Sequence, residues 1–516
     1  MMPAFNSSTE WAPVLFTPFI LVNLFVLRHF QGKTEPTHSY LAIFVFILGI
    51  FVLVKGTFIV LILMVIAVVS VDQIVKSKKM SWIVPGFIIS VLILWVFSNQ
   101  KIGNIFNYFL STADLIAGYK DGMGNEKGSK LGILPIIFAI GSIGFVGIFF
   151  LTVKKCLGWR GICPACILAA TLFVLFQHGF TRQDPQHSVP ACLSFCSLCM
   201  LVLPLMWKQA GENKPLRLAV VANGFSGIII VFTCYLSGAG IPALNTVVQR
   251  INQLPILITQ GISALDDARD NHMQLLKQKY SLPEFDGKME SSTFDAGLAE
   301  AYGYYSMIRP TLTLYAANTS KMSRRNKDYL EDASGPKTIL FFTGASLDGR
   351  YPTAPDSIGL LAQKTHFAAI GSIGNLLVME RRANPLKLQF EKIKELNVNF
   401  NEEILLPAPG NGMIFTQIDI LPTLAGKLFS ILYKPAAIFI AVGVDNEERK
   451  FRLIRATAKE GMILSPLLYD LPAFRNFYSD SESSSNLSYF KIESEKGREW
   501  CYRAKIKVML YKVDAK

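Results

Sequence analysis

Eight strongly apolar segments fill most of the first 240 residues of this 516-residue chain. They are 15 to 24 residues long, close to the roughly 20 residues that span the hydrocarbon core of a bilayer as a helix. Because backbone polar groups in lipid must be satisfied internally, we expect each segment to be helical. The segments lie at about 12–28, 40–54, 57–73, 82–98, 132–153, 163–177, 189–206 and 217–240.

The stretch 40–73 is either one over-long helix or two short helices that break at Lys55-Gly56. Three later connections are rich in lysine and arginine and should therefore be cytoplasmic. A break at Lys55 puts the basic linker 29–39 on the cytoplasmic side as well, so we expect two helices and eight crossings in all. The three basic connections are 75–80, 154–161 and 208–217.

This topology places both chain ends on the extracytoplasmic side of the membrane. Lys55 at a hairpin tip and the connections 99–131 and 178–188 should share that face. An amphipathic stretch in 99–131 is expected to lie along the interface, where it either roofs a lipid-side cavity or simply closes the bundle. Its apolar residues are Phe106, Tyr108, Phe109, Leu115 and Ile116.

After Gly240 the composition becomes that of a soluble protein, so we expect a transmembrane helical domain at 1–241 and extracytoplasmic domains beyond it. The segment 242–385 should hold a helical and α/β unit, and 386–516 a β-sandwich-like domain. In the former we expect a polar helix over 245–280, a loop over 283–294, and buried strands at KTILFF (337–342) and NLLVMERR (375–382). In the latter we expect strands at LKLQF, GMIFTQIDIL, KLFSILYK, AIFIAVGV, KFRLIRA, SYFKIES and YRAKIKVMLYK.

Charge and cysteine content narrow the classes of partner. The net charge of +13 comes without a basic tract beside aromatic residues, which argues against nucleic acid and for anionic lipid or phosphate. Seven of the eight cysteines lie in or beside apolar segments, so no disulfide framework is expected. The pairs Cys163/Cys166 and Cys196/Cys199 indicate either redox or metal chemistry or the packing of a small hydrophobic residue between helices.

The connection FQHGFTRQDPQHS (176–188) carries the densest set of reactive side chains. Arg182 has the planar fork suited to a diphosphate, and Asp184 is a candidate general base whose pKa a membrane-edge site could raise. His178 and His187 either assist or join Asp184 around a divalent metal, which leaves the cofactor undetermined. Alternatively, Arg182 and the histidines anchor the loop at the headgroups and Asp184-Pro185 makes a turn.

Two further sets of residues are candidates. Lys55 binds phosphate if it faces a site, or lies at the outer surface if the hairpin ends there. In the soluble part, RPTLTLYAANTSKM (309–322) and LDGRYPTAPDS (347–357) hold residues that suit sugar hydroxyls and pyranose faces, although DGRYP is also good turn chemistry. The candidate glycan contacts are Tyr315, Asn318, Arg350, Tyr351 and Asp356.

Several motifs together resemble a family of bacterial polytopic membrane proteins. QHGFTRQDPQH is similar to the family's KHGFVRHDGH loop, STADLIAGYKDGM (111–123) to an acidic-aromatic run ending in SGYS and AM, and Lys55 in VKGTF to the lysine of KFTF. In the soluble part, RPTLTLYAANTSKMSRRN, GPKTILFF and LDGRYPTAPDS are similar to RP, SYxAYTPxLxxxN, ILF and IDGRYP motifs in the same order. KLFSILYKP and GMILSPL also resemble the family.

The family resembles the glycosyltransferase-C superfamily in organisation. The resemblance implies a polyprenyl-phosphate-linked sugar used at the extracytoplasmic face, a glycan acceptor, and a role in envelope polysaccharide or glycolipid assembly. Asp184, or alternatively Asp114, would be the base, with His178 assisting and Arg182, His187 and Lys55 binding the lipid phosphate.

Departures from the family pattern leave a second hypothesis open. The family's second histidine is Gln183 here, its Asp-Gly is Asp184-Pro185, and relatives have more N-terminal helices. The chain is then either an active glycosyltransferase or a shortened, inactive subunit or glycan-binding scaffold that works with a partner membrane protein. A transporter is the most distant hypothesis.

Overall fold

The computed structural model describes residues 12–31, 38–78, 81–124, 132–236, 255, 259–261, 263–293, 295, 297–311, 314–343, 347–407, 412–481 and 487–515. These residues fall into two compact units, each of which is described by itself. The helical unit comprises residues 2–113 and 125–258, and the sheet unit comprises residues 114–124 and 259–516.

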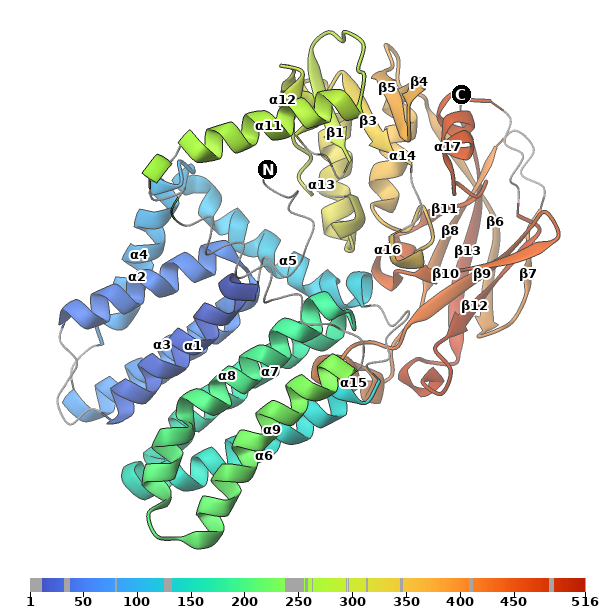
Figure 1. Cartoon of the computed structure of the whole chain (residues 1–516). Helices are drawn as coiled ribbons and strands as arrows, with labels where there is room; N and C mark the ends of the chain where they lie inside the picture. Colours follow the sequence, from blue (N-terminus) through green and yellow to red (C-terminus); the bar gives the residue numbers. More distant parts are fainter. Residues whose placement is uncertain are drawn as a thin grey trace. The chain divides into compact units, whose positions relative to one another are not determined.

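All eight apolar segments contain a long helix, which confirms their predicted secondary structure (Figure 1). A further helix, α5, lies in the connection 99–131, and its second half belongs to the sheet unit. The bounds are α1 Ala12–Gln31, α2 His38–Val54, α3 Thr57–Ser77, α4 Ile83–Phe97, α5 Ile105–Met123, α6 Leu134–Leu157, α7 Ile162–Thr181, α8 Pro185–Ala210 and α9 Lys214–Cys234.

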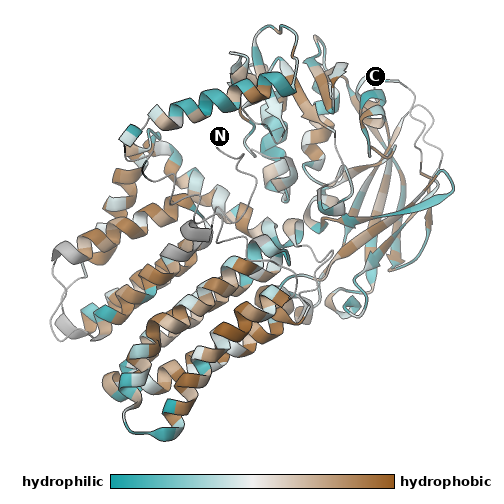
Figure 2. Cartoon of the chain, in the orientation of Figure 1, coloured by the Kyte–Doolittle hydropathy of each residue, from teal (hydrophilic) through white to brown (hydrophobic). Residues whose placement is uncertain are grey.

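Four helical stretches among the described residues are long and apolar enough to cross a membrane, or five if the bent pair of α4 and α5 is one span. Apolar residues run along most of their length, and polar residues gather at the turn between α8 and α9 (Figure 2). The crossing of all eight helices stays a prediction. The stretches are Phe58–Val75, Leu134–Thr181, His187–Ala210 and Lys214–Cys234.

Two breaks in the helical unit follow from length and charge. The 48-residue stretch Leu134–Thr181 would be about 72 Å long as one helix, more than twice the hydrocarbon thickness. A 3-10 turn at Gly158–Gly161 instead folds α7 back to pack on α6. The break expected at Lys55-Gly56 is also present, because α2 ends at Val54 and α3 begins at Thr57.

The first part of the sheet unit is a mixed sheet of five strands in the order β2-β1-β3-β5-β4. β1 runs parallel to β2 and β3, whereas β5 is antiparallel to both β3 and β4. The strands β3 and β5 confirm the two predicted buried strands, but β1 lies where a loop was expected. The bounds are β1 Lys288–Ser292, β2 Tyr305–Met307, β3 Thr338–Phe342, β4 Phe367–Ile373 and β5 Leu376–Arg381.

Helices cover both faces of this sheet because its central strands are apolar on both sides (Figure 1). Ile339 and Phe341 pack with α13, α14 and α17, whereas Leu340 of the same strand packs with α11 and α12. This alternation is the period of a strand. The helix bounds are α11 Ser263–Lys279, α12 Leu298–Ala301, α13 Ser320–Glu331, α14 Ser357–His366, α16 Arg455–Glu460 and α17 Leu471–Tyr478.

The second part of the sheet unit has two antiparallel sheets of four strands, in the orders β10-β9-β12-β7 and β11-β8-β13-β6. One hydrophobic cluster contains residues of both, such as Ile440 and Phe490 of the first sheet and Ile418 and Val508 of the second. The bounds are β6 Leu388–Asn399, β7 Ile404–Leu405, β8 Met413–Asp419, β9 Ile438–Val444, β10 Glu447–Leu453, β11 Met462–Ser465, β12 Tyr489–Ser494 and β13 Lys505–Ala515.

One predicted strand is wrong. KLFSILYK lies mostly in a helix, α15, which runs from Leu424 to Leu432. Thr423 caps this helix by accepting a hydrogen bond from the backbone nitrogen of Gly426 at 3.0 Å. A threonine directly before the first helical residue is a favoured N-cap, and it outweighs the β-like composition of the segment.

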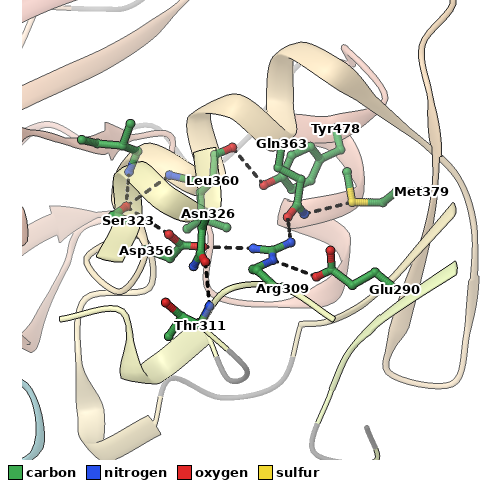
Figure 3. A network of polar contacts seen from close by, with 12 residues as sticks. Glu290, Arg309, Thr311, Ser323, Asn326, Asp356, Leu360, Gln363, Met379 and Tyr478 are labelled. Carbon is green, nitrogen blue, oxygen red and sulfur yellow. Dashed lines mark hydrogen bonds and ion pairs between the residues drawn. The ribbon is translucent and has the colours of Figure 1, made fainter. Parts of the chain in front are cut away.

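A buried arginine, Arg309, joins the mixed sheet to the helices beside it (Figure 3). Arg309 Nε lies 2.8 Å from Glu290 Oε1 of β1, and its Nη1 lies 3.0 Å from Asp356 Oδ2 at the start of α14. Its Nη2 donates to Gln363 Oε1 at 3.1 Å. The guanidinium of Arg309 thus binds a carboxylate of β1 and a carboxylate at the start of α14, and it links the strand to the helix.

Asp356 is surrounded by further donors from α13. Ser323 Oγ donates to Asp356 Oδ1 at 3.0 Å, and Asn326 also contacts the carboxylate (Figure 3). Burial raises the pKa of Asp356 to about 6, although Arg309, Asn326 and Ser323 act in the opposite direction. Burial of this carboxyl group therefore depends on the arginine beside it.

We expect Arg309→Met to lower the free energy of unfolding of the sheet unit by roughly 3–5 kcal/mol, because it leaves two carboxylates buried without their cation. Pulse proteolysis of the full chain in detergent across a urea series measures this. The matched control is Arg324→Met, which removes an exposed ion pair with Glu460 and should change little. Equal effects of the two substitutions would contradict the structural role of Arg309.

Candidate functional site

The connection that the sequence singles out is much shorter than predicted. α7 continues to Thr181 and α8 begins at Pro185, so only residues 182–184 lie between the two helices. His178 is therefore inside the last turn of α7, and His187 lies in the first turn of α8. The four candidate side chains come from two adjoining helix ends instead of from a free loop.

Asp184 is the N-cap of α8. Its Oδ1 accepts hydrogen bonds from the backbone nitrogen of His187 at 3.0 Å and from His187 Nδ1 at 2.6 Å. Arg182 Nε donates to the other oxygen, Oδ2, at 3.0 Å. An aspartate followed by Pro185 at the first helical position is a favoured helix start, so the local sequence accounts for this geometry.

Close packing of α7 on α8 brings the two imidazoles together. A Cβ atom at Gly179 would lie 2.5 Å from the Cβ of Ala191, so only glycine permits this approach. The ring centroids of His178 and His187 are consequently 5.2 Å apart. Phe180, the next residue of α7, is buried with its ring centroid 5.2 Å from that of Phe138.

Lys55 belongs to the same cluster. It lies between α2 and α3, α3 packs on α7, and the charge of Lys55 acts on His178. Among the described residues, the Lys55 ammonium has no hydrogen-bond or ion-pair partner, and neither has the buried Nε2 of His178. We call Lys55, His178, Arg182, Asp184 and His187 the turn cluster.

The pKa values follow from this packing. Removal from water lowers the pKa of Lys55 to about 8. Burial raises the pKa of Asp184, but the hydrogen bonds and charges of His187 and Arg182 outweigh burial and hold that pKa below its usual value. This is opposite to the expectation that the site raises the pKa of Asp184, and it makes the carboxylate a weaker base.

The chemistry available to the turn cluster is that of an anion site. Asp184 already accepts from three donors, Arg182 among them, and Lys55 adds a cation that has no ion-pair partner among the described residues. The unpartnered nitrogen of His178 can donate to a ligand in one tautomer, and buried polar atoms without partners are uncommon. Nowhere in the described ranges do three or more His, Cys, Asp or Glu side chains form a group that could hold a metal ion.

Asp114, the alternative base, lies in the other compact unit. Its Oδ2 is 2.8 Å from Lys321 Nζ, and other residues of the same half of α5 also contact the sheet unit. Asp121 pairs with Arg455 at 3.2 Å, and a Cβ at Gly122 would lie 2.0 Å from Asn318 Cγ. The STADLIAGYKDGM motif therefore works as a docking segment for this unit.

The predicted glycan contacts are mostly inaccessible. Asn318, Arg350, Tyr351 and Asp356 are buried, and Tyr315 is half-buried. Arg350 donates to the carbonyl oxygen of Tyr315 at 2.6 Å and to Met123 Sδ at 2.8 Å. In this structure these side chains join segments of the sheet unit, and direct contact of any of them with a sugar stays a prediction.

Sequence reasoning missed two buried ion clusters. One is the Arg309 network, whose partners are scattered over residues 290–363 with no local spacing to reveal them. The other lies in the helical unit, where Asp72 is 2.9 Å from His29 and 2.5 Å from Arg160. An aspartate inside an apolar helix was the available signal for the second cluster.

Comparison with protein-family models, with curated proteins and with solved structures finds no match. The function is therefore argued from the geometry of the turn cluster.

We expect Asp184→Ala to lower the melting temperature of the detergent-solubilised chain, because loss of an N-cap costs helices about 1 kcal/mol. Asp184→Asn should stay close to the parent, since asparagine caps a helix about as well as aspartate. Thermal unfolding followed by tryptophan fluorescence measures both. Equal losses would show that the charge of Asp184, not its capping geometry, stabilises the turn.

Proposed function

We propose that this chain is a multi-pass bacterial inner-membrane protein that binds a polyprenyl-phosphate-linked sugar through the turn cluster. The proposed role is that of a glycosyltransferase-like protein of envelope polysaccharide or glycolipid assembly. The observation that carries it is the desolvated ammonium of Lys55 acting on His178, since neither the ammonium nor the buried Nε2 of His178 has a partner among the described residues, and both suit a phosphate ester.

The membrane arrangement is part of the proposal. Eight helices would cross the bilayer, and the basic connections would lie in the cytoplasm. Lys55 and the α7–α8 turn would then share the extracytoplasmic face with the sheet unit, whose two antiparallel sheets would form a β-sandwich. The shared hydrophobic cluster of those sheets supports that description.

An apolar groove supports a lipid ligand. A cavity of about 450 Å³ is lined by α2 and α4, with Leu41, Phe46, Trp82 and Ile93 among its walls. From Phe46, α2 continues for about 14 Å to Lys55, a length that the tail of a polyprenyl phosphate spans easily. A carrier with its phosphate at Lys55 would place its tail along α2.

The role of Asp184 separates two versions of the proposal. In the glycosyltransferase version, Asp184 or Asp114 takes the proton of an acceptor hydroxyl, with His178 assisting. In the scaffold version, Asp184 only caps α8 and a partner membrane subunit supplies the chemistry. The lowered pKa of Asp184 and its three donors favour the scaffold version.

The first test is binding of undecaprenyl phosphate to the full chain in nanodiscs, compared with undecaprenol. We expect the phosphate to bind more tightly, and Lys55→Met to weaken it at least about tenfold, because charge-assisted hydrogen bonds contribute roughly 1.5–3 kcal/mol. Microscale thermophoresis measures both ligands. Lys208→Met, a cytoplasmic-side lysine in the proposed topology, is the control. Equal affinities for phosphate and alcohol would refute the proposal.

The pH dependence follows from Lys55. Its pKa of about 8 in the free protein means that it loses its charge between pH 7 and 9. A bound phosphate favours the charged form, so binding takes up a proton and the affinity should fall as pH rises above about 8, by at most about tenfold per pH unit. Lys55→Arg should remove this fall, because arginine stays protonated. The same titration on both variants measures it.

Asp184→Asn distinguishes the two versions, since it keeps the cap but removes the base. The glycosyltransferase version predicts loss of the glycan product in cells, with the folded amount of protein unchanged. The scaffold version predicts an unchanged product. Mass spectrometry of lipid-linked glycans from a complemented deletion strain measures the product, and quantitative blotting measures the protein.

A further inference from the structure

The helix α15 (Figure 1), whose sequence resembled a strand, carries exposed apolar side chains. Leu424 is 76% exposed, and Leu428, Ile431 and Leu432 are 56–65% exposed. Spacings of four, three and one residues place all four on a single face of a helix.

The opposite face of α15 is the one that packs. A Cβ atom at Gly426 would lie 2.0 Å from the carbonyl oxygen of Cys501, so this glycine lets the helix lie directly on the 3-10 turn Glu499–Cys501. Thr423 Oγ1 also donates to the carbonyl oxygen of Trp500 at 2.9 Å. A surface helix normally turns its apolar side inward. Here the inward face holds Gly426 and Phe429, which packs against the core, and the leucines point away.

The rim of this face has the composition of a membrane interface. Trp500 is half-exposed, with its ring 5.6 Å from that of Phe429. Lys427 is an exposed basic residue of α15 itself. Arg503 is also exposed, and its backbone N–H donates to the carbonyl oxygen of Leu421, an exposed residue just before α15. Tryptophan and basic residues around an apolar face are typical of helices that lie in the headgroup region.

A second amphipathic segment adjoins α15. Lys120 of α5 donates to the carbonyl oxygens of Ser430 and Ile431 at 3.0 and 3.1 Å, at the end of α15. In this half of α5, Leu115 and Ile116 are each 41% exposed. Two helices of the sheet unit thus present apolar side chains to the outside, and a direct hydrogen-bonded contact joins them.

We propose that α15 is a membrane-docking helix whose leucines insert into the lipid interface of the bilayer that the helical unit occupies. At nine residues α15 is too short to span, so it would lie in the plane of the interface. A bilayer is the occupant that fits, because the same chain carries membrane-spanning candidates and because the basic rim complements anionic lipid. The inference needs only a membrane location and is independent of the ligand of the turn cluster.

Photo-crosslinking in the reconstituted full chain tests this docking. Leu428→p-benzoylphenylalanine is placed in nanodiscs of phosphatidylethanolamine and phosphatidylglycerol that contain an alkyne-tailed phosphatidylcholine. The matched control is the same substitution at Leu405, a 69% exposed leucine of β7 in the same unit. We expect a lipid adduct at Leu428 at least fivefold above that at Leu405, and the same result at Leu432.

Three outcomes would overturn the proposal. A crosslink from Leu428 to a peptide of the helical unit would show that the chain itself covers α15. A crosslinked dimer would show that a second copy covers it. Equal lipid labelling at Leu428 and Leu405, including none at either, would show that α15 does not enter the bilayer. Substitution at an exposed side chain leaves the packing of Gly426 intact, so folding does not confound the comparison.

Discussion

A charged side chain that is buried away from water needs a partner of opposite charge, and both units depend on this constraint. In the sheet unit Arg309 is buried only because Glu290 and Asp356 receive it. In the helical unit Asp72 is buried between His29 and Arg160 in the same way. Against this background the turn cluster differs, because its desolvated cation, Lys55, has no ion-pair partner among the described residues. A group that is desolvated and left unpaired is better explained by a ligand than by stability.

The same constraint explains why Asp184 has two competing roles. A helix N-terminus offers backbone donors and a positive dipole, so an aspartate there is both stabilised and made less basic. His187 and Arg182 strengthen that effect. Catalysis by this carboxylate would need a ligand that draws Arg182 or His187 away from it. A phosphate is such a ligand, since it competes for the same donors.

The amino-acid sequence predicted those helices, strands and site residues that depend on a local sequence pattern. The eight helices and the break at Lys55 follow from apolar length and charge, and strands such as β3 and β9 follow from apolar residues of strand length. The turn cluster could be predicted because most of its members are close in sequence. α15 was missed because its apolar residues suit a strand and only the cap at Thr423 and the close contact at Gly426 indicate a helix. The burial of Arg350 and Asp356 depends on partners far along the chain, which no local pattern reveals.

The exposed leucines of α15 raise the opposite question, which is why apolar side chains lie on the surface. A contiguous exposed apolar patch usually marks a site of interaction. Several hydrophobic residues exposed in the helical unit are explained if its helices lie in lipid, and α15 extends that explanation to the sheet unit. Gly426 is the residue that makes it possible, since a larger side chain would lift the helix off Cys501. Lys120 then joins α15 to the docking half of α5. The membrane would thereby act on the sheet unit through two joined amphipathic helices, so that lipid contact and the fold of this unit constrain each other.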